Sequence, residues 1–185
     1  MANEVHKYLQ EKMDKTMSVL RSDLMSVRAG RANPALLDRI TVEYYGSPTP
    51  LKQLANISVP EPRLLQIQPY DMTAIPEIEK AIMVSDLGLN PSNDGKLIRL
   101  NLPMLTEERR KELVKTVKKL GEDAKVALRN ERRDANDKLK KMHKSNELTE
   151  DDLRKAEDEV QKMTDDHVKD VDRIIKEKED EIMEV

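Results

Sequence analysis

Arginine side chains gather near the middle of the sequence, where Arg129, Arg132 and Arg133 fall within five residues. The planar guanidinium group donates hydrogen bonds in a fixed fork, which suits phosphate oxygens better than the point charge of lysine does. A helical wheel at about 100° per residue places these arginines on one flank of a helix. This flank, called the basic strip below, consists of Lys111, Lys115, Lys118, Lys125, Arg129, Arg132, Arg133, Asn136, Lys140 and Lys144.

The basic strip has two interpretations. It can be a solvated helix face that contributes only to solubility, which is the common case in helical bundles. It can also be a surface that binds an anionic partner. Three arginines in five residues favour the second interpretation, because a mixture of Lys and Glu would give the same solubility. Acidic side chains gather further round the same helix, with Glu122 as the main exception: Glu112, Asp123, Asp134 and Asp137.

Other reactive side chains form no recognisable site. His6, His143 and His167 are widely spaced, and although the last two fall on different helices that could approach, no third metal ligand is evident. The chain has no cysteine, which excludes disulfides and thiolate metal sites. It also lacks a Ser–His nucleophile pattern and a glycine-rich phosphate loop. We therefore expect a protein that is not an enzyme, with no catalytic residue, no metal and no cofactor.

Three segments have the apolar periodicity of long amphipathic helices, over residues 3–29, 107–144 and 149 onwards. The apolar stripes are Val5, Leu9, Met13, Met17, Leu20, Leu24 and Val27 in the first helix, Leu113, Val117, Leu120, Ala124, Leu128, Ala135, Leu139 and Met142 in the second, and Leu153, Ala156, Val160, Met163, His167, Val171, Ile174 and Ile182 in the third. No single helix can bury its own stripe. We therefore expect an elongated antiparallel three-helix bundle.

The segment between the first two helices has a different character, and all nine prolines lie within it. Alternating and β-branched residues predict short strands over 40–45, 57–59, 64–68 and 97–102. Turns are expected at 46–48 and 90–95, and Pro76 is typical of a first helical turn. The predicted fold class is thus α+β. Residues 1–30 and 105–185 form a discontinuous bundle, residues 31–104 an inserted, β-rich α/β domain, and Gly30, Arg31, Pro103, Met104 and Leu105 a two-strand hinge between them.

Charge is distributed unevenly along the chain, although its net value is only −3. Residues 106–144 carry 14 basic and 8 acidic side chains, a net +6, whereas residues 145–185 carry 7 and 16, a net −9. Binding depends on the local field, so the second helix is compatible with a nucleic-acid partner. No apolar run approaches the roughly 20 residues of a membrane span, and no signal-peptide core precedes the first helix. We expect a soluble cytoplasmic protein that does not contact membranes.

The basic strip contains no aromatic residue on which an unpaired base could stack. Folded RNA is recognised instead through its phosphates, its 2′-hydroxyl groups and its shape. If the partner is RNA, we therefore expect structured RNA held by its backbone. The alternative is a helical scaffold or adaptor whose basic strip docks on an acidic protein surface.

Five segments together resemble the bacterial ribosome recycling factors, in the order found in that family. They are residues 27–34 (VRAGRANP), 42–51 (VEYYGSPTPL), 85–91 (SDLGLNP), 105–111 (LTEERRK) and 129–138 (RNERRDANDK). The resemblance implies an L-shaped molecule, similar in outline to a tRNA, with a three-helix bundle and a flexibly attached small domain. Such factors bind the large subunit of a ribosome left with mRNA and deacylated tRNA. With elongation factor G, which hydrolyses GTP, they split the subunits.

The resemblance also implies roles for individual residues. Arg129, Arg132 and Arg133 would hold ribosomal RNA of the large subunit, with Arg28 and Arg31 contributing near the elbow. We include Lys125 and Asn136 in this RNA-binding set because they lie on the same strip. The small domain would receive the push of elongation factor G and swing about the hinge. We expect the chain to act as a monomer.

Overall fold

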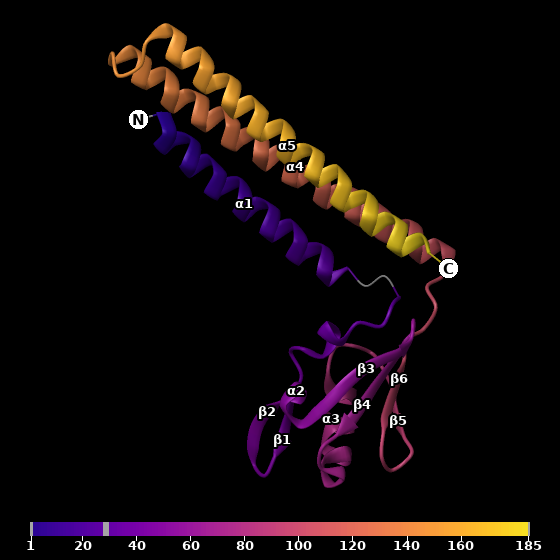
Figure 1. Cartoon of the computed structure of the whole chain (residues 1–185). Coiled ribbons are helices and arrows are strands. Elements are labelled where there is room, and N and C mark those ends of the chain that lie inside the picture. The colour runs from indigo at the N-terminus through magenta and orange to yellow at the C-terminus, as the bar shows by residue number, and fades with distance from the viewer. Residues whose placement is uncertain (1, 28–29, 185) are drawn as a thin grey trace. The chain divides into compact units, whose positions relative to one another are not determined.

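The computed structural model describes residues 2–27 and 30–184. The chain divides into two compact units (Figure 1): a helical unit from residues 1–29 and 107–185, and a small unit from residues 30–106. The predicted α+β fold class is confirmed, because long helices build the first unit and an antiparallel sheet the second. None of the helices within the described residues has the length and apolar character of a membrane span.

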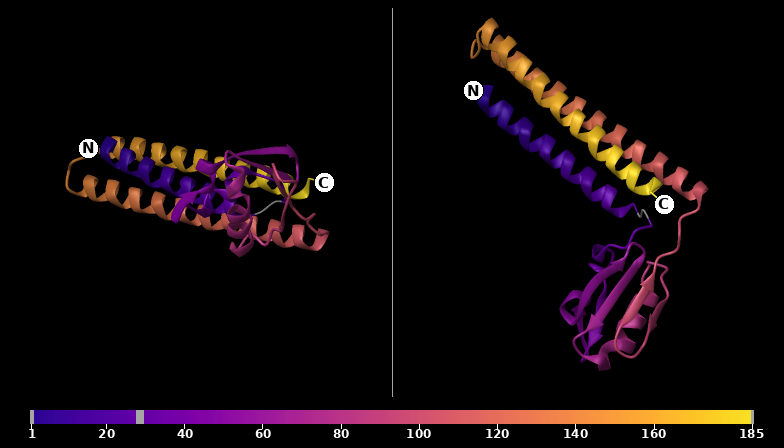
Figure 2. Two further views of the ribbon diagram at one scale, coloured as in Figure 1. Left: turned by 90° about the horizontal axis from the view of Figure 1, so that it is seen from below. Right: turned by 45° about the vertical axis from the view of Figure 1, so that its right-hand side comes forward.

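The helical unit is a bundle of α1 (Ala2–Ser26), α4 (Glu107–Lys144) and α5 (Glu150–Met183). Each helix contacts the other two. Helices α1 and α5 run in one direction and α4 in the other (Figure 1), and α4 and α5 lie side by side in the right-hand view of Figure 2. This is the antiparallel three-helix arrangement that the shared apolar stripes predict.

The predicted stripes form the interior of this bundle. Side chains that are completely buried come from all three helices: Met13, Val117, Leu128, Leu139, Val160, Val171 and Ile182. The stripe of α5 also contains a residue that the pattern does not reveal, Thr164, which is 1% exposed. Its hydroxyl group donates to the carbonyl of Val160 at 2.8 Å, so burial leaves no unpaired donor.

The connection between α4 and α5 is closed by polar contacts at both helix ends. Asn146 follows α4 with a φ of 61°, and its N–H donates to the carbonyl of His143 at 3.0 Å. Asparagine tolerates this left-handed conformation better than most residues do. The Thr149 hydroxyl then accepts a hydrogen bond from the N–H of Asp152 at 3.1 Å. This is the helix start that the sequence Thr-Glu-Asp-Asp indicates.

Helices α4 and α5 come unusually close at Gly121. A Cβ atom added there would lie 2.7 Å from Cγ1 and 3.1 Å from Cδ1 of Ile175. The glycine is buried, although a helix interior normally disfavours this residue. Its role is to leave room for the Ile175 side chain.

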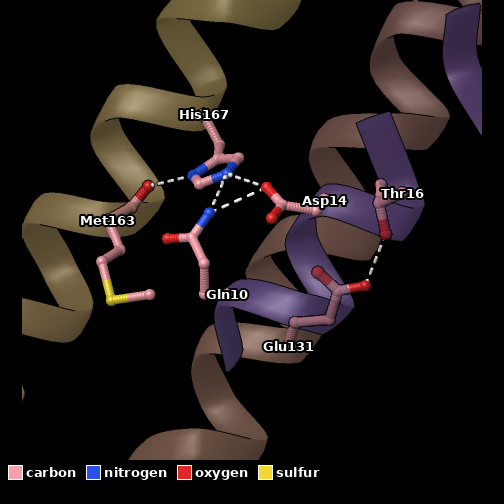
Figure 3. A network of polar contacts seen from close by, with 6 residues as sticks. All are labelled: Gln10, Asp14, Thr16, Glu131, Met163 and His167. Carbon is pink, nitrogen blue, oxygen red and sulfur yellow. Dashed lines mark hydrogen bonds and ion pairs between the residues drawn. The ribbon is translucent and has the colours of Figure 1, made fainter. Parts of the chain in front are cut away.

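Polar contacts between the helices lie at the edge of the bundle interior (Figure 3). Glu131 of α4 points toward α1, where its Oε1 accepts a hydrogen bond from the hydroxyl of Thr16 at 2.6 Å. Its Oε2 is buried and has no hydrogen-bond partner among the described residues. Burial raises the pKa of the Glu131 carboxyl group, against the opposing effects of Thr16, Lys12 and His167, while Asp134 raises it further. The bundle therefore holds a carboxylate that is incompletely compensated.

His167 forms the second half of the network and joins α5 to α1. Its Nδ1–H donates to the carbonyl of Met163 at 2.6 Å, which leaves Nε2 of the neutral ring as an acceptor. The amide nitrogen of Gln10 lies 3.4 Å from that Nε2 and 2.8 Å from Oδ1 of Asp14. His167 thus packs on the seam and is held by hydrogen bonds, as its position in the apolar stripe predicts.

The small unit contains a four-stranded antiparallel sheet in the order β3 (Ala55–Glu61), β4 (Leu64–Pro69), β6 (Ile98–Asn101), β5 (Pro91–Asn93). The helix α3 (Ile75–Val84), the one-turn helix α2 (Leu51–Leu54) and the 3-10 turns Pro34–Leu37 and Met72–Ala74 complete it. Its core is entirely aliphatic, and the completely buried side chains are Val42, Leu51, Leu65, Ile67, Ile78, Ile82, Ile98 and Leu100. The predicted strands over 40–45, 57–59, 64–68 and 97–102 correspond to observed strands.

Two turn predictions in the small unit are wrong in detail. The turn expected at 46–48 lies at Tyr45 and Gly46, whose φ values of 52° and 75° are typical of a two-residue hairpin, and β2 (Ser47–Pro50) follows at once to pair with β1 (Thr41–Tyr44). Proline is tolerated in β2 because this strand pairs with β1 alone. Likewise Pro91–Asn93, expected to lie in a turn, forms the edge strand β5.

Replacing Gly121 with Ala is expected to destabilise the protein by about 1 kcal/mol. The gain in helix propensity, about 1 kcal/mol, is smaller than the cost of forcing a methyl group against Ile175, about 1–3 kcal/mol. Urea unfolding followed by circular dichroism measures the difference. The double variant Gly121→Ala/Ile175→Ala should be more stable than the sum of the single effects predicts. If the effects of the two single substitutions simply add, the new methyl group at position 121 does not press against Ile175.

The stability of the wild type relative to Glu131→Gln should depend on pH. Because burial raises the folded-state pKa above the ordinary value of 4.5, protonation of Glu131 stabilises the folded state. That stabilisation is complete below the pKa that Glu131 has in the unfolded chain, and it is lost as pH rises through the pKa of Glu131 in the folded protein. The wild type should therefore gain stability relative to Glu131→Gln between about pH 7 and about pH 4. If the difference in urea midpoint between the wild type and Glu131→Gln stays constant across this range, Glu131 is not a buried, titrating carboxyl group.

Candidate nucleic-acid interface

The arginines at the centre of the basic strip lie together on the outer side of α4. Leu128, Ala135 and Leu139 are buried against the other helices and fix the rotation of α4 about its axis. Arg129 and Arg133 consequently face solvent, while Arg132 is half-buried. The structure thus brings together the three arginines that the sequence places on one flank.

None of these arginines is neutralised by the acidic helix beside it. The structure gives Arg129 and Arg133 no ion pair with any described residue. Arg132 lies closest to α5, and its Nη1 donates a long hydrogen bond of 3.5 Å to the amide oxygen of Gln161, a neutral side chain. The acidic groups of α5 form ion pairs largely within that helix, as the pairs of Arg154 with Asp151 and of Arg173 with Glu177 show. The guanidinium groups therefore keep their charge available to a ligand.

Lys125 has a different environment, although it lies on the same flank. Its ammonium group is 2.5 Å from Oδ1 of Asp172 and 3.6 Å from Oε1 of Glu122, and the side chain is 17% exposed. The hydrogen bond to Asp172 raises the pKa of Lys125 against the opposing effect of desolvation. Lys125 is therefore already engaged within the bundle, and a phosphate would have to displace Asp172 to bind it.

The surface around Lys125 is a shallow groove of about 440 Å³ between α4 and α5. Its lining residues are Lys118, Gly121, Glu122, Lys125, Asp172, Ile175, Lys176 and Glu179. Three lysines and three acidic residues oppose one another there, so the groove has little net charge. The positive charge of the strip that no acidic residue offsets is therefore greatest at the arginines.

Asn136 lies only partly on the surface. Its side chain is half-buried, and its Oδ1 is buried without a hydrogen-bond partner among the described residues. This oxygen can accept a hydrogen bond from a donor, but it cannot bind a phosphate oxygen, which is itself an acceptor. The amide nitrogen, which is a donor, is the part of Asn136 that suits a phosphate oxygen.

The remaining predicted site residues lie where the chain passes between the units. Arg28 falls outside the described residues. Arg31 is exposed and belongs to the small unit, as do Pro103, Met104 and Leu105. Gly30 has a φ of 76°, and a Cβ added to it would lie 3.1 Å from Cγ of Leu105. The two crossings thus touch at this glycine, and their role as a hinge stays a prediction.

Two features of this surface were missed from the sequence. Glu131 is close in sequence to the arginines, but its side chain points inward (Figure 3). The helical wheel indicates this orientation, because it places Glu131 on the apolar stripe of the helix. The second is a cation–π cluster in which Lys138 and Lys12 lie 4.0 Å and 5.5 Å from the ring centroid of Tyr8. No periodicity within one helix reveals this contact, because it joins α1 to α4.

The histidines form no metal site in the part of the chain that the structure describes, where no cluster of three or more potential ligands occurs. His143 caps the loop after α4, with its Nδ1 3.0 Å from the carbonyl oxygen of Leu148. His6 joins α1 to α5 through a contact of 3.1 Å between its Nε2 and the carbonyl oxygen of Ala156. All three histidines therefore have packing roles.

Comparison with known proteins supports a single family. The family model described as ribosome recycling factor matches residues 20–183, which span both units. The chain is 66% identical to the ribosome-recycling factor of Alkaliphilus metalliredigens and 64% identical to that of Geobacillus kaustophilus, over the full length of each protein.

Solved structures agree with this result. The solution structure of a ribosome recycling factor superposes with a TM-score of 0.80 at 40% identity and covers 100% of this chain and 98% of its own. A second similar structure, with a TM-score of 0.66, 48% identity and 99% coverage of both chains, models the Thermus thermophilus ribosome recycling factor and Escherichia coli elongation factor G bound to the Escherichia coli post-termination complex. With full-length identity above 60% and the same helical and small units, this chain belongs to the ribosome recycling factor family.

Proposed function

We propose that this chain recycles ribosomes after translation termination. It binds the large subunit of the post-termination ribosome through structured ribosomal RNA. Together with elongation factor G and GTP it then separates the subunits, which releases mRNA and tRNA. Membership of the family supports this proposal, as does the relative that was placed with elongation factor G on a post-termination complex.

The observation that supports RNA as the partner is that two arginines of the basic strip are exposed and form no ion pair within the described part of the chain. Arg129 and Arg133 are exposed on one face of a rigid helix and have no ion pair with a described residue, although acidic α5 is adjacent. Cations that are not neutralised internally can exchange counterions for phosphates, and this release drives association with nucleic acid. Guanidinium groups also make bidentate contacts with phosphate oxygens. A merely solvated face would not need to keep its arginines apart from the neighbouring carboxylates.

The aromatic residues favour recognition of the RNA backbone over unpaired bases. Helix α4 has no aromatic side chain, and the nearby Tyr8 has its ring occupied by the ammonium groups of Lys138 and Lys12. Base stacking requires a free aromatic face. Contacts with phosphates and 2′-hydroxyl groups of folded RNA remain, and these suit the rigid arrangement of the arginines on a helix.

The contribution of this chain to splitting is mechanical in this proposal, and elongation factor G supplies the chemistry of GTP hydrolysis. Side chains buried between three long helices make the bundle stiff. The small unit receives force from elongation factor G, and the crossings at Gly30–Arg31 and Pro103–Leu105 bend. We infer no catalytic residue in this chain.

Replacing Arg129 or Arg133 with Ala should weaken binding to large ribosomal subunits about tenfold, because each substitution removes a hydrogen bond to a charged group. The slope of log affinity against log salt concentration should become less steep by somewhat under one unit per arginine. Co-sedimentation with purified large subunits over a series of salt concentrations measures both quantities. Lys125→Ala should have a smaller effect, because Asp172 already neutralises this lysine.

Arg173→Ala is the matched control, since Arg173 is an exposed arginine of α5 that already pairs with Asp170 and Glu177. Its affinity and salt slope should equal those of the wild type. If the Arg129 and Arg133 variants also bind like the wild type at every salt concentration, the strip does not contact RNA. Docking on an acidic protein would then be the better interpretation. A splitting assay with and without elongation factor G tests the rest of the proposal.

A further inference from the structure

Gln161 is an exception on the exposed face of α5. Between Glu150 and Asp180, a stretch that the structure describes throughout, every other exposed residue of this helix is charged. Gln161 is also the α5 residue that Arg132 of α4 contacts, with 3.5 Å between Nη1 of the arginine and the amide oxygen. An uncharged side chain thus lies on this highly charged surface at the position beside an arginine of the basic strip.

Position 161 interrupts a row of carboxylates. Glu157, Gln161 and Asp165 are spaced four residues apart, so they lie one above the other along α5. A glutamate at position 161 would be as long as the glutamine and would make the row continuous. Its carboxylate would then lie beside the guanidinium group of Arg132, within reach of an ion pair.

The contact between Lys125 and Asp172 shows the consequence of a carboxylate in such a place. Nζ of Lys125 is 2.5 Å from Oδ1 of Asp172, and a phosphate has to displace that carboxylate in order to bind the lysine. Arg132 also lies against α5 and is half-buried, but the residue that it contacts is neutral. The two cations differ in the charge of their α5 neighbour, and only Arg132 keeps its positive charge available to a ligand.

Asp165 sets the direction of the Gln161 amide. Its Oδ1 accepts a hydrogen bond from Nε2 of Gln161 at 2.8 Å. A carboxylate only accepts hydrogen bonds and a guanidinium group only donates them, so Gln161 must turn its nitrogen toward Asp165 and its oxygen toward Arg132. The amide therefore suits a position between an acid and a base. Neither Glu nor Lys at position 161 would satisfy both neighbours.

The contact between Gln161 and Arg132 is weak enough for RNA to replace it. At 3.5 Å the hydrogen bond is long, and both side chains reach solvent. A phosphate oxygen carries charge and makes a shorter and stronger bond to a guanidinium group than an amide oxygen does. Gln161 thus orients the Arg132 side chain before binding and does not compete with a phosphate for it.

We propose that Gln161 is a positioning residue of the RNA-binding surface, which orients Arg132 toward ribosomal RNA and keeps the acidic charge of α5 away from it. Gln161 acts through Arg132 and does not itself bind the RNA. The inference rests on the proposed function, because it assigns a role within the same surface.

The first test compares Gln161→Glu with Gln161→Ala in co-sedimentation with purified large ribosomal subunits over a series of salt concentrations. Gln161→Glu should bind about fivefold more weakly, because a phosphate must first break an exposed ion pair. Its salt slope should become less steep by somewhat under one unit. Gln161→Ala adds no charge, so it should lose at most about twofold in affinity and keep the wild-type slope. Wild-type affinity and slope for Gln161→Glu would contradict the proposal.

The second test separates the position of the added charge from its amount. The double variant Gln161→Glu/Asp165→Asn has the net charge of the wild type, but its carboxylate lies one helical turn nearer to Arg132. It should bind as weakly as Gln161→Glu, whereas Asp165→Asn alone should bind no more weakly than the wild type. If the double variant binds like the wild type, affinity follows net charge and Gln161 has no positioning role.

The third test asks whether Gln161 acts through Arg132. In the Arg132→Ala background, Gln161→Glu should cause no further loss of affinity, because the guanidinium group that it neutralises is gone. If Gln161→Glu weakens binding there by the same factor as in the wild type, its effect does not pass through Arg132 and the proposal is wrong.

The two proposals fail in different ways. If Arg132→Ala binds large subunits like the wild type at every salt concentration, the RNA-binding surface of the proposed function does not include Arg132, and Gln161 has no role in it. If Arg132→Ala weakens binding and Gln161→Glu does not, the proposed function stands and the role of Gln161 is wrong.

Discussion

Burial of one narrow apolar stripe on each of three helices is the constraint on which the rest of the helical unit depends. A stripe containing Leu128 and Leu139 must face inward on α4, so the residues opposite it must face outward. The outward position of Arg129 and Arg133 is therefore a consequence of packing and needs no further contact to hold it. Half-buried Glu131 departs from this apolar pattern, and Thr16 of α1 provides a hydrogen bond to only one of its two oxygens.

The ion pairs of α5 explain why the neighbouring arginines keep their charge. Helix α5 carries many carboxylates next to a basic neighbour, an arrangement that would ordinarily neutralise both helices. Its basic residues instead lie three or four positions from its own acids, as Arg173 does from Asp170 and Glu177. The exception is Asp172, which reaches Lys125 on α4. An acidic side chain of α5 thus neutralises the basic strip at Lys125, and the arginines that follow it keep their charge.

Features that repeat along the chain could be predicted from the sequence, and features that depend on a single contact could not. The three stripes, the start of α5 at Thr149 and most strands follow from periodicity and local chemistry. The close approach at Gly121 depends on Ile175, which is 54 positions away along the chain and belongs to another helix. The hairpin turn was misplaced because Gly46-Ser47-Pro48 has typical turn composition, whereas the structure uses Tyr45 in a conformation that its residue type disfavours. The arginine cluster was predictable, but the engagement of Lys125 by Asp172 depends on how α5 packs.

The distribution of aromatic residues has a consequence for spectroscopy. Because the chain lacks Trp and Phe, its near-ultraviolet absorption and intrinsic fluorescence come from four tyrosines. Tyr45 and Tyr70 are largely exposed on the small unit and Tyr8 is 48% exposed on the helical unit. Three of the four tyrosines therefore report on the surfaces of the protein, whereas half-buried Tyr44 packs against the core of the small unit. Contact with another molecule changes the signal without any attached dye.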